Sequence, residues 1–224
     1  MKTLKNCLKC LPLLFVLAFV SCKKDSNNNP ENNLDITKFY IAGKHTTINQ
    51  ITLPYIITFG ANADAFISNG LGASDHGNYT YKDGVITIIW SPSAKDTFHI
   101  SNEQIASFEG TSTLESYFFQ KTPEQNALNG HLYSGSLKNN KNNFLVVTRM
   151  KFSASQYGET SLGDPVPNKD YSTINNASGG SNTGNNGTLT FFVLINGNLE
   201  VSRASNNNAN GSATYSTGTL KPSN

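Results

Sequence analysis

The sequence has little cysteine, little tryptophan and little charge. Its 224 residues include three cysteines and one tryptophan, and charged residues make up 14%. Cys7 and Cys10 form a C-x-x-C pair, but they lie in an N-terminal segment that we expect to be removed, which leaves Cys22 alone. One cysteine can form neither an internal disulfide nor a thiolate metal site, so stability must come from a hydrophobic core.

The N-terminal segment has the pattern of a secretory signal. Three lysines, the last of them Lys9, precede an apolar run over residues 11–20, which is followed by the small residue Ser21. About ten apolar residues are too few for a membrane-spanning helix, which needs roughly 20. We therefore expect a signal peptide over residues 1–21, cleaved before Cys22.

A strong excess of charge of either sign is also lacking. The chain has 17 lysines and arginines against 15 acidic residues, and three of the lysines lie in the signal segment, so the rest is close to neutral. With no basic cluster, we expect no nucleic-acid partner. Asn, Gly, Ser and Thr are abundant, which favours strands and turns over helices. A chain of this length can form one large β domain or two small ones.

The residues around Cys22 resemble a lipid-attachment signal. Phe-Val-Ser-Cys, residues 19–22, is similar to the cleavage box of bacterial lipoproteins, and Ser-Cys-Lys-Lys-Asp, residues 21–25, resembles lipoproteins of the Bacteroidetes group. The resemblance implies lipidation of Cys22, each buried methylene contributing about 0.8 kcal/mol to a membrane anchor. The Asn-rich residues 22–34 are then a solvated tether. Lys23, in place of the aspartate associated with inner-membrane retention, indicates the cell outer membrane, with the leaflet left open; ordinary secretion is the alternative.

The strongest structural pattern is a hairpin over residues 76–90. Asp83-Gly84 is a typical type I′ turn, because both residues tolerate positive φ. A two-residue loop places Tyr81 opposite Ile86 and Tyr79 opposite Ile88, so one face is aromatic and aliphatic while the other is mostly polar.

A second hairpin is expected over residues 189–203, around Asn196-Gly197. Its register places Leu194 opposite Leu199 and Phe192 opposite Val201. The other face, with Phe191 opposite Ser202 and Val193 opposite Glu200, is expected to be more exposed.

Other strand candidates recur about every ten residues, which predicts an antiparallel sandwich or up-and-down barrel. They are residues 36–42, 55–59, 65–68, 96–101, 104–108, 115–121, 131–137, 144–153 and 212–220. Very little helix is expected; the one candidate, residues 122–130, has Thr122 as N-cap, Pro123 at the first helical position and Gly130 as terminator. We take residues 123–130 as a short helical connector. The Asn/Gly/Ser-rich residues 175–187 are expected to form a surface loop.

The order of elements from residue 36 to residue 121 resembles the lipocalin-like domains of Bacteroidetes lipoproteins. The similarity lies in residues 53–68, 77–90, 95–110 and 117–121. It implies an all-β fold, an antiparallel lipocalin-like barrel or sandwich over residues 35–122, and a ligand cavity, but it transfers no site residues. Residues 131–221 are expected to form a second β-rich unit, for which no family resemblance is found.

Aromatic residues are the candidates for a binding site. Tyr79, Tyr81 and Trp90 share one face of the first hairpin, and Tyr55 is of the same kind. They can fill the core, line an apolar cavity with polar tips, or form an exposed stacking platform for sugars. The four histidines are scattered without metal-ligand spacing. No hydrolase, phosphate-loop or calcium-loop motif is present, so we expect no catalytic residues, no metal and no cofactor.

These observations lead to two functional hypotheses. The first is a lipid-anchored, non-catalytic protein of the cell envelope that binds a small apolar or amphipathic ligand in a β-barrel or cleft. The alternative is a structural or surface-interaction protein, acting in glycan attachment, in adhesion or as an accessory subunit of an envelope complex. The partners are then the membrane, through the lipid, and a small ligand or glycan; the sequence names no protein partner.

Overall fold

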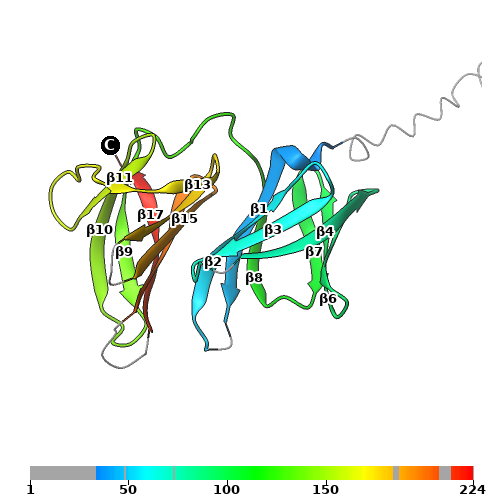
Figure 1. Cartoon of the computed structure of the whole chain (residues 1–224), viewed down its shortest axis with the longest axis horizontal. Helices are drawn as coiled ribbons and strands as arrows, with labels where there is room; N and C mark the ends of the chain where they lie inside the picture. Colours follow the sequence, from blue (N-terminus) through cyan, green and yellow to red (C-terminus); the bar gives the residue numbers. More distant parts are fainter. Residues whose placement is uncertain (1–33, 48, 73, 184–186, 207–212, 224) are drawn as a thin grey trace, which may run out of the picture.

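The computed structural model describes residues 34–47, 49–72, 74–183, 187–206 and 213–223. The predicted signal peptide, Cys22 and nearly all of the Asn-rich tether lie outside these ranges. The described chain is all-β: two antiparallel sheets each curl into a nearly closed barrel, and the barrels stand side by side (Figure 1). Within the described ranges, no helix has the length and apolar character needed to cross a membrane.

The first barrel takes eight consecutive strands in the order β7-β6-β5-β4-β3-β2-β1-β8. Their bounds are β1 (Phe39–Thr46), β2 (Thr52–Phe59), β3 (Asp64–Asn69), β4 (Ser74–Lys82), β5 (Val85–Ser91), β6 (Ala94–Ser101), β7 (Gln104–Gly110) and β8 (Leu114–Lys121). Every pair except β1–β8 consists of sequence neighbours, so the topology is up-and-down, as the strand spacing predicts.

The first predicted hairpin is confirmed as β4 and β5. Tyr79 pairs with Ile88 and Tyr81 with Ile86. Asp83 and Gly84 have φ angles of 51° and 77°, as a type I′ turn requires. Ile86 and Ile88 are fully buried, while both tyrosines pack against the same interior cluster.

One end of this barrel is closed by a single-turn 3-10 helix, η3 (Ile36–Lys38). Asp35 caps it by accepting a hydrogen bond from the backbone N–H of Thr37, and Ile36 is buried in the interior cluster. The sequence predicted a strand from residue 36; the structure begins that strand at Phe39 because the preceding residues turn inward to cover the barrel end.

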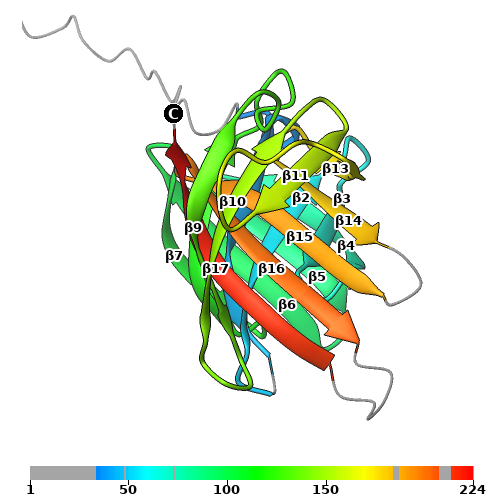
Figure 2. The ribbon, with the colours of Figure 1, turned by 90° about the vertical axis from the view of Figure 1, so that its left-hand side faces the viewer.

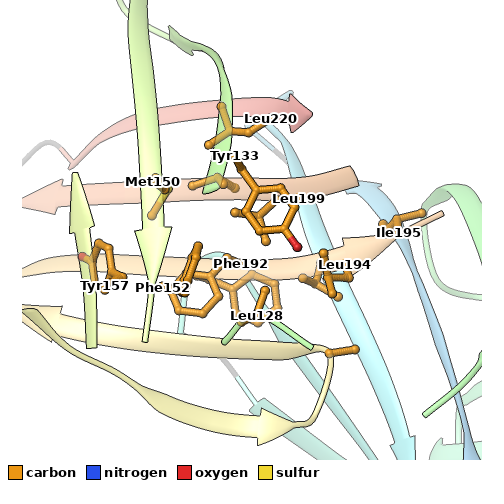
Figure 3. Close-up of a cluster of buried hydrophobic side chains, with 14 of the residues drawn as sticks. Leu128, Tyr133, Met150, Phe152, Tyr157, Phe192, Leu194, Ile195, Leu199 and Leu220 are labelled. Carbon is orange, nitrogen blue, oxygen red and sulfur yellow. The ribbon is translucent and has the colours of Figure 1, made fainter. Parts of the chain in front are cut away.

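The second barrel has the order β12-β11-β10-β9-β17-β16-β15-β14-β13. Its strands are β9 (Leu132–Asn139), β10 (Leu145–Phe152), β11 (Gln156–Thr160), β12 (Lys169–Asp170), β13 (Ser172–Asn175), β14 (Ser178–Thr183), β15 (Thr188–Ile195), β16 (Asn198–Asn206) and β17 (Ala213–Ser223). Figure 2 shows the central strands side by side. Phe152, Tyr157, Phe192 and Leu199 meet inside it (Figure 3).

The predicted helix over residues 122–130 is wrong: this connector is a series of turns. Asn126 accepts a hydrogen bond from the backbone N–H of Leu128 at 3.0 Å and donates one to the hydroxyl of Tyr171 at 2.7 Å. Two helical turns have little intrinsic stability, and an asparagine side chain competes for the backbone groups. Leu128 is fully buried in the second barrel, which fixes the connector.

The expectation of a surface loop over residues 175–187 is also wrong where the structure describes it. Residues 178–183 form β14, which pairs with β15, and Ala177 is fully buried. A Cβ at Gly179 would lie 2.9 Å from the ring of Phe192 and 3.0 Å from that of Tyr171. The glycine is needed because two aromatic rings pack directly on the backbone.

The second hairpin has the predicted register, but the face expected to be exposed is buried. Leu194 pairs with Leu199 and Phe192 with Val201. On the opposite face, Phe191, Val193, Glu200 and Ser202 are at most 8% exposed. This face is covered by the first barrel, a long-range contact that local alternation cannot indicate.

The contact between the barrels combines apolar packing with specific hydrogen bonds. Tyr40, Ala42 and Ile56, on the outer side of β1 and β2, join the buried cluster of the second barrel. The Tyr40 hydroxyl donates to the carbonyl of Leu194 at 3.1 Å. The Lys44 ammonium lies 3.1 Å from the carboxylate of Glu200. The two barrels therefore share a buried apolar interface.

Candidate functional site

The end of the first barrel opposite η3 opens into a cavity of about 580 Å³. The β1–β2, β3–β4, β5–β6 and β7–β8 connections all lie at this end, because an up-and-down barrel places alternate loops together (Figure 1). Its apolar wall comes from Ile67, Trp90 and Leu114, and polar residues of the loops form the rest. We call this opening the first mouth.

Trp90 is held at the first mouth by a buried carboxylate. Its indole N–H donates to Oδ2 of Asp96 at 2.7 Å. The backbone N–H groups of Thr111 and Ser112 each donate to Oδ1 of Asp96 at 3.1 Å, and the Ser112 hydroxyl donates to Oδ2. Asp96 is fully buried, but its oxygens have four donors, so its desolvation is compensated.

The position of Trp90 follows from the backbone. The β5–β6 register shifts between Ile89 and Ser91, which places Trp90 in a β-bulge. A bulge can re-aim a side chain next to a site. Asp96 then fixes both the indole ring and the β7–β8 connection, so the cavity wall is pre-organised.

His45 contributes a polar atom without a partner. Its ring lies at the first mouth, edge-on to Tyr55 with 6.1 Å between centroids. Nε2 is buried and has no hydrogen-bond partner in the part of the chain that the structure describes. Burial lowers the pKa of His45 below its usual value, although the nearby Glu115 carboxylate opposes the effect. The ring is therefore neutral at pH 7, and Nε2 is a polar group in an otherwise apolar wall.

Of the four aromatic residues proposed from the sequence, Trp90 lines the cavity and the three tyrosines pack into the interior. Tyr55 is fully buried, its hydroxyl donates to the carbonyl of Ser116 at 3.1 Å, and burial raises its pKa well above the usual value. The Tyr79 hydroxyl donates to the carbonyl of Gly60 at 3.2 Å, at the closed end. Tyr81 packs against the same core next to the β4–β5 turn. All three side chains of this hairpin therefore pack against the same interior cluster, and Trp90 also lines the first mouth.

Sequence reasoning did not select Asp96 or His45. Asp96 was included only as the first residue of the strand candidate 96–101, and His45 only as one of the four scattered histidines. Alternation contained the signal for Asp96, since it shares the inward face of β6 with Phe98 and Ile100, both buried. A carboxylate in line with a core stripe is unusual enough to mark a buried polar network.

Comparison of the chain with models of protein families, with curated proteins and with solved structures found no match. Within the ranges that the structure describes, no three His, Cys, Asp or Glu side chains come together in a group that could hold a metal ion. The geometry of the first mouth is therefore the basis for any functional assignment.

Proposed function

We propose that the protein binds a small apolar or amphipathic ligand in the first mouth, without covalent chemistry. The observation that carries this proposal is the cavity of about 580 Å³ at the open end of a barrel whose other end is closed by η3. Ligand sites have volumes of about 300–1,000 Å³ and combine an apolar wall with a few fixed polar groups.

The residues of the first mouth fit that description. The indole ring of Trp90, with Ile67 and Leu114, supplies apolar contact area. Nε2 of the neutral His45 and the hydroxyl-bearing loop at residues 111–113 supply polar contacts. Because Asp96 fixes Trp90 in advance, little side-chain entropy is lost on binding.

We also propose that the protein is a lipoprotein of the outer membrane, anchored through Cys22. The support is the sequence around Cys22 and the position of the first described residues. Leu34 and η3 lie at the closed end, so the first mouth opens away from the point where the tether enters the barrel. Replacing Cys22 with Ala should move the protein from the membrane fraction to the soluble fraction; continued membrane association would contradict lipidation.

Trp90, the single tryptophan, gives a direct test of ligand binding. The neutral amphipathic probe N-phenyl-1-naphthylamine, titrated into the protein, should quench Trp90 emission by energy transfer and itself become fluorescent. Ile67→Phe places a ring in the first mouth and should weaken probe binding about tenfold, which corresponds to about 1.4 kcal/mol. Ile89→Phe is the matched control, because Ile89 is 52% exposed on the outer face of β5.

Equal binding by the two variants would show that the probe occupies another surface, and absence of binding by the unmodified protein would refute the proposal.

The surface-interaction alternative stays a hypothesis. Its motivation is the run Phe144–Val147, four consecutive apolar residues that are 49–69% exposed.

A further inference from the structure

The second barrel has an interior of two kinds. Near the connector its inner side chains are apolar and aromatic (Figure 3). At the other end a separate hollow of about 470 Å³ is lined by charged and hydroxyl-bearing side chains of β11, β12, β15 and β16, together with Val146 and Val147 of β10. We call this hollow the second mouth.

Three charged residues face into the second mouth, as the strand registers show. Glu159 pairs with Met150, Lys169 with Tyr157 and Arg203 with Thr190. Paired residues of antiparallel strands project from the same face, and Met150, Tyr157 and Thr190 are all buried inside the barrel. The three charged side chains therefore project from the inner face of the barrel, where Glu159 and Arg203 are largely buried and Lys169 remains 41% exposed.

Two of these residues are cations that share one carboxylate. Nη2 of Arg203 lies 2.5 Å from Oε1 of Glu159, and Nζ of Lys169 lies 3.5 Å from Oε2. Lys169 also lies 5.6 Å from the centre of the Tyr157 ring. No other charged residue is among the described residues that line the second mouth, so its net charge is about +1.

This arrangement is poorly explained by stability alone. The Glu159 and Arg203 side chains are 15% and 23% exposed. Removing ions from water costs free energy, and replacing a buried ion pair with well-packed apolar residues is often neutral or stabilising. One positive charge has no counterion within the hollow. The guanidinium has five N–H donors, of which Glu159 accepts one in the structure.

The other lining groups add hydrogen-bonding capacity. Ser161, Thr190 and Ser205 bring hydroxyl groups to the same hollow. Thr190 also interacts with the Tyr157 hydroxyl, with 3.4 Å between oxygens. Guanidinium groups recognise carboxylates in a two-point geometry, and hydroxyl groups pair with ligand hydroxyls as donors or acceptors.

We propose that the second mouth binds a small hydroxylated organic anion of the sugar-acid class. The ligand carboxylate lies on Arg203 and Lys169, where it neutralises the unpaired positive charge, and the ligand hydroxyls contact the serine and threonine side chains. This site is separate from the first mouth and uses none of its residues.

The test is calorimetric titration of the purified full-length protein with three probes: glucuronate, glucose and inorganic phosphate. Glucuronate should bind, glucose should not, and added salt should weaken glucuronate binding. Arg203→Met should reduce glucuronate affinity at least about tenfold. Lys138→Met, which removes one positive charge from the outer face of β9, should leave the affinity unchanged. Lys169→Met serves as a second variant if Arg203→Met lowers the folded fraction.

Glu159→Gln tests whether the ion pairs of Glu159 are part of a binding site or only stabilise the fold. Removing the internal carboxylate frees both cations, so glucuronate should bind several-fold more tightly even as thermal stability falls. A structural pair would give the loss of stability with unchanged affinity, which overturns the proposal. So would a lack of glucuronate binding, tighter binding of phosphate than of glucuronate, or equal effects of Arg203→Met and Lys138→Met. Binding of N-phenyl-1-naphthylamine should be the same in Arg203→Met and the unmodified protein, so the two sites are tested independently.

Discussion

Replacing Asp96 with Ala should lower the stability of the protein by disrupting the hydrogen bonds at the first mouth. The substitution removes the acceptor of three N–H groups, those of Trp90, Thr111 and Ser112. A buried donor left without a partner costs about 1–3 kcal/mol. Because water from the open cavity can reach part of this network, we take the lower value for each group and expect a loss of roughly 3 kcal/mol in the free energy of unfolding.

A more conservative substitution of Asp96 should give a smaller loss in the free energy of unfolding. Asp96→Asn keeps the shape, but its amide nitrogen cannot accept from the indole N–H, so the expected loss is about 1–2 kcal/mol. Asp75→Asn is the control, because Asp75 is an exposed carboxylate at the same mouth. It should change stability by less than about 0.5 kcal/mol.

The assay is urea denaturation followed by Trp90 fluorescence, with near-ultraviolet circular dichroism of the folded variant. Trp90 emission should shift to longer wavelength in Asp96→Ala before any denaturant is added, because the indole loses its fixed partner. A loss below about 1 kcal/mol, or an unchanged emission spectrum, would mean that the mouth does not depend on this carboxylate.

Three further predictions concern pH, the barrel contact and a turn. Burial lowers the pKa of His45, so the folded state disfavours its protonation; stability should be complete above about pH 6.5 and fall as pH decreases through the folded pKa. In urea titrations, the free energy of unfolding should depend less on pH in His45→Gln than in the unmodified protein. An identical pH dependence would contradict this prediction. Lys44→Met leaves Glu200, 8% exposed, without its cation, and should destabilise the protein by about 2–3 kcal/mol in the same titrations; a loss confined to experimental error would mean that the contact contributes little. Gly84→Val places a β-branched residue at a φ of 77° and should cost more than about 1 kcal/mol in thermal unfolding, whereas unchanged stability would contradict the turn assignment.

Local chemistry predicted the hairpins well. Asp83-Gly84 and Asn196-Gly197 define turns in which both central residues have positive φ, and the turn sets the pairing of every residue that follows. The register of both hairpins was therefore readable from a few adjacent residues, and with it the placement of Ile86 and Ile88 in the core.

The candidate sites depend on contacts that local patterns do not define. The second mouth joins Glu159, Lys169 and Arg203 from three strands, and their pairing requires the barrel to close. The first mouth depends on a bulge at Trp90 and on Asp96, whose inward position follows from alternation but whose partners lie in the β7–β8 connection. Sequence alternation gives the face of a strand, whereas the loop that covers it is decided by tertiary structure.

The error on the outer face of the second hairpin has a physical explanation that the sequence does contain. Phe191–Ile195 is an unbroken apolar run, and such runs are typical of strands buried on both faces, whereas alternation is typical of strands with one face in water. All five residues are at most 9% exposed. Leu53–Ile57 on β2 is the comparable run in the first barrel and is fully buried in the same way.

These two runs lie against each other in the structure, since β2 and β15 pack across the contact between the barrels. Each barrel alone would expose one side of its run to water. The same contact places the two mouths on one side of the molecule: a Cβ at Gly72, in the β3–β4 turn of the first mouth, would lie 2.5 Å from Leu189, which precedes Thr190 of the second. Burying these two strands on both faces therefore stabilises the contact between the barrels. It also fixes the relative orientation of the barrels, in which both mouths face away from the closed end at η3.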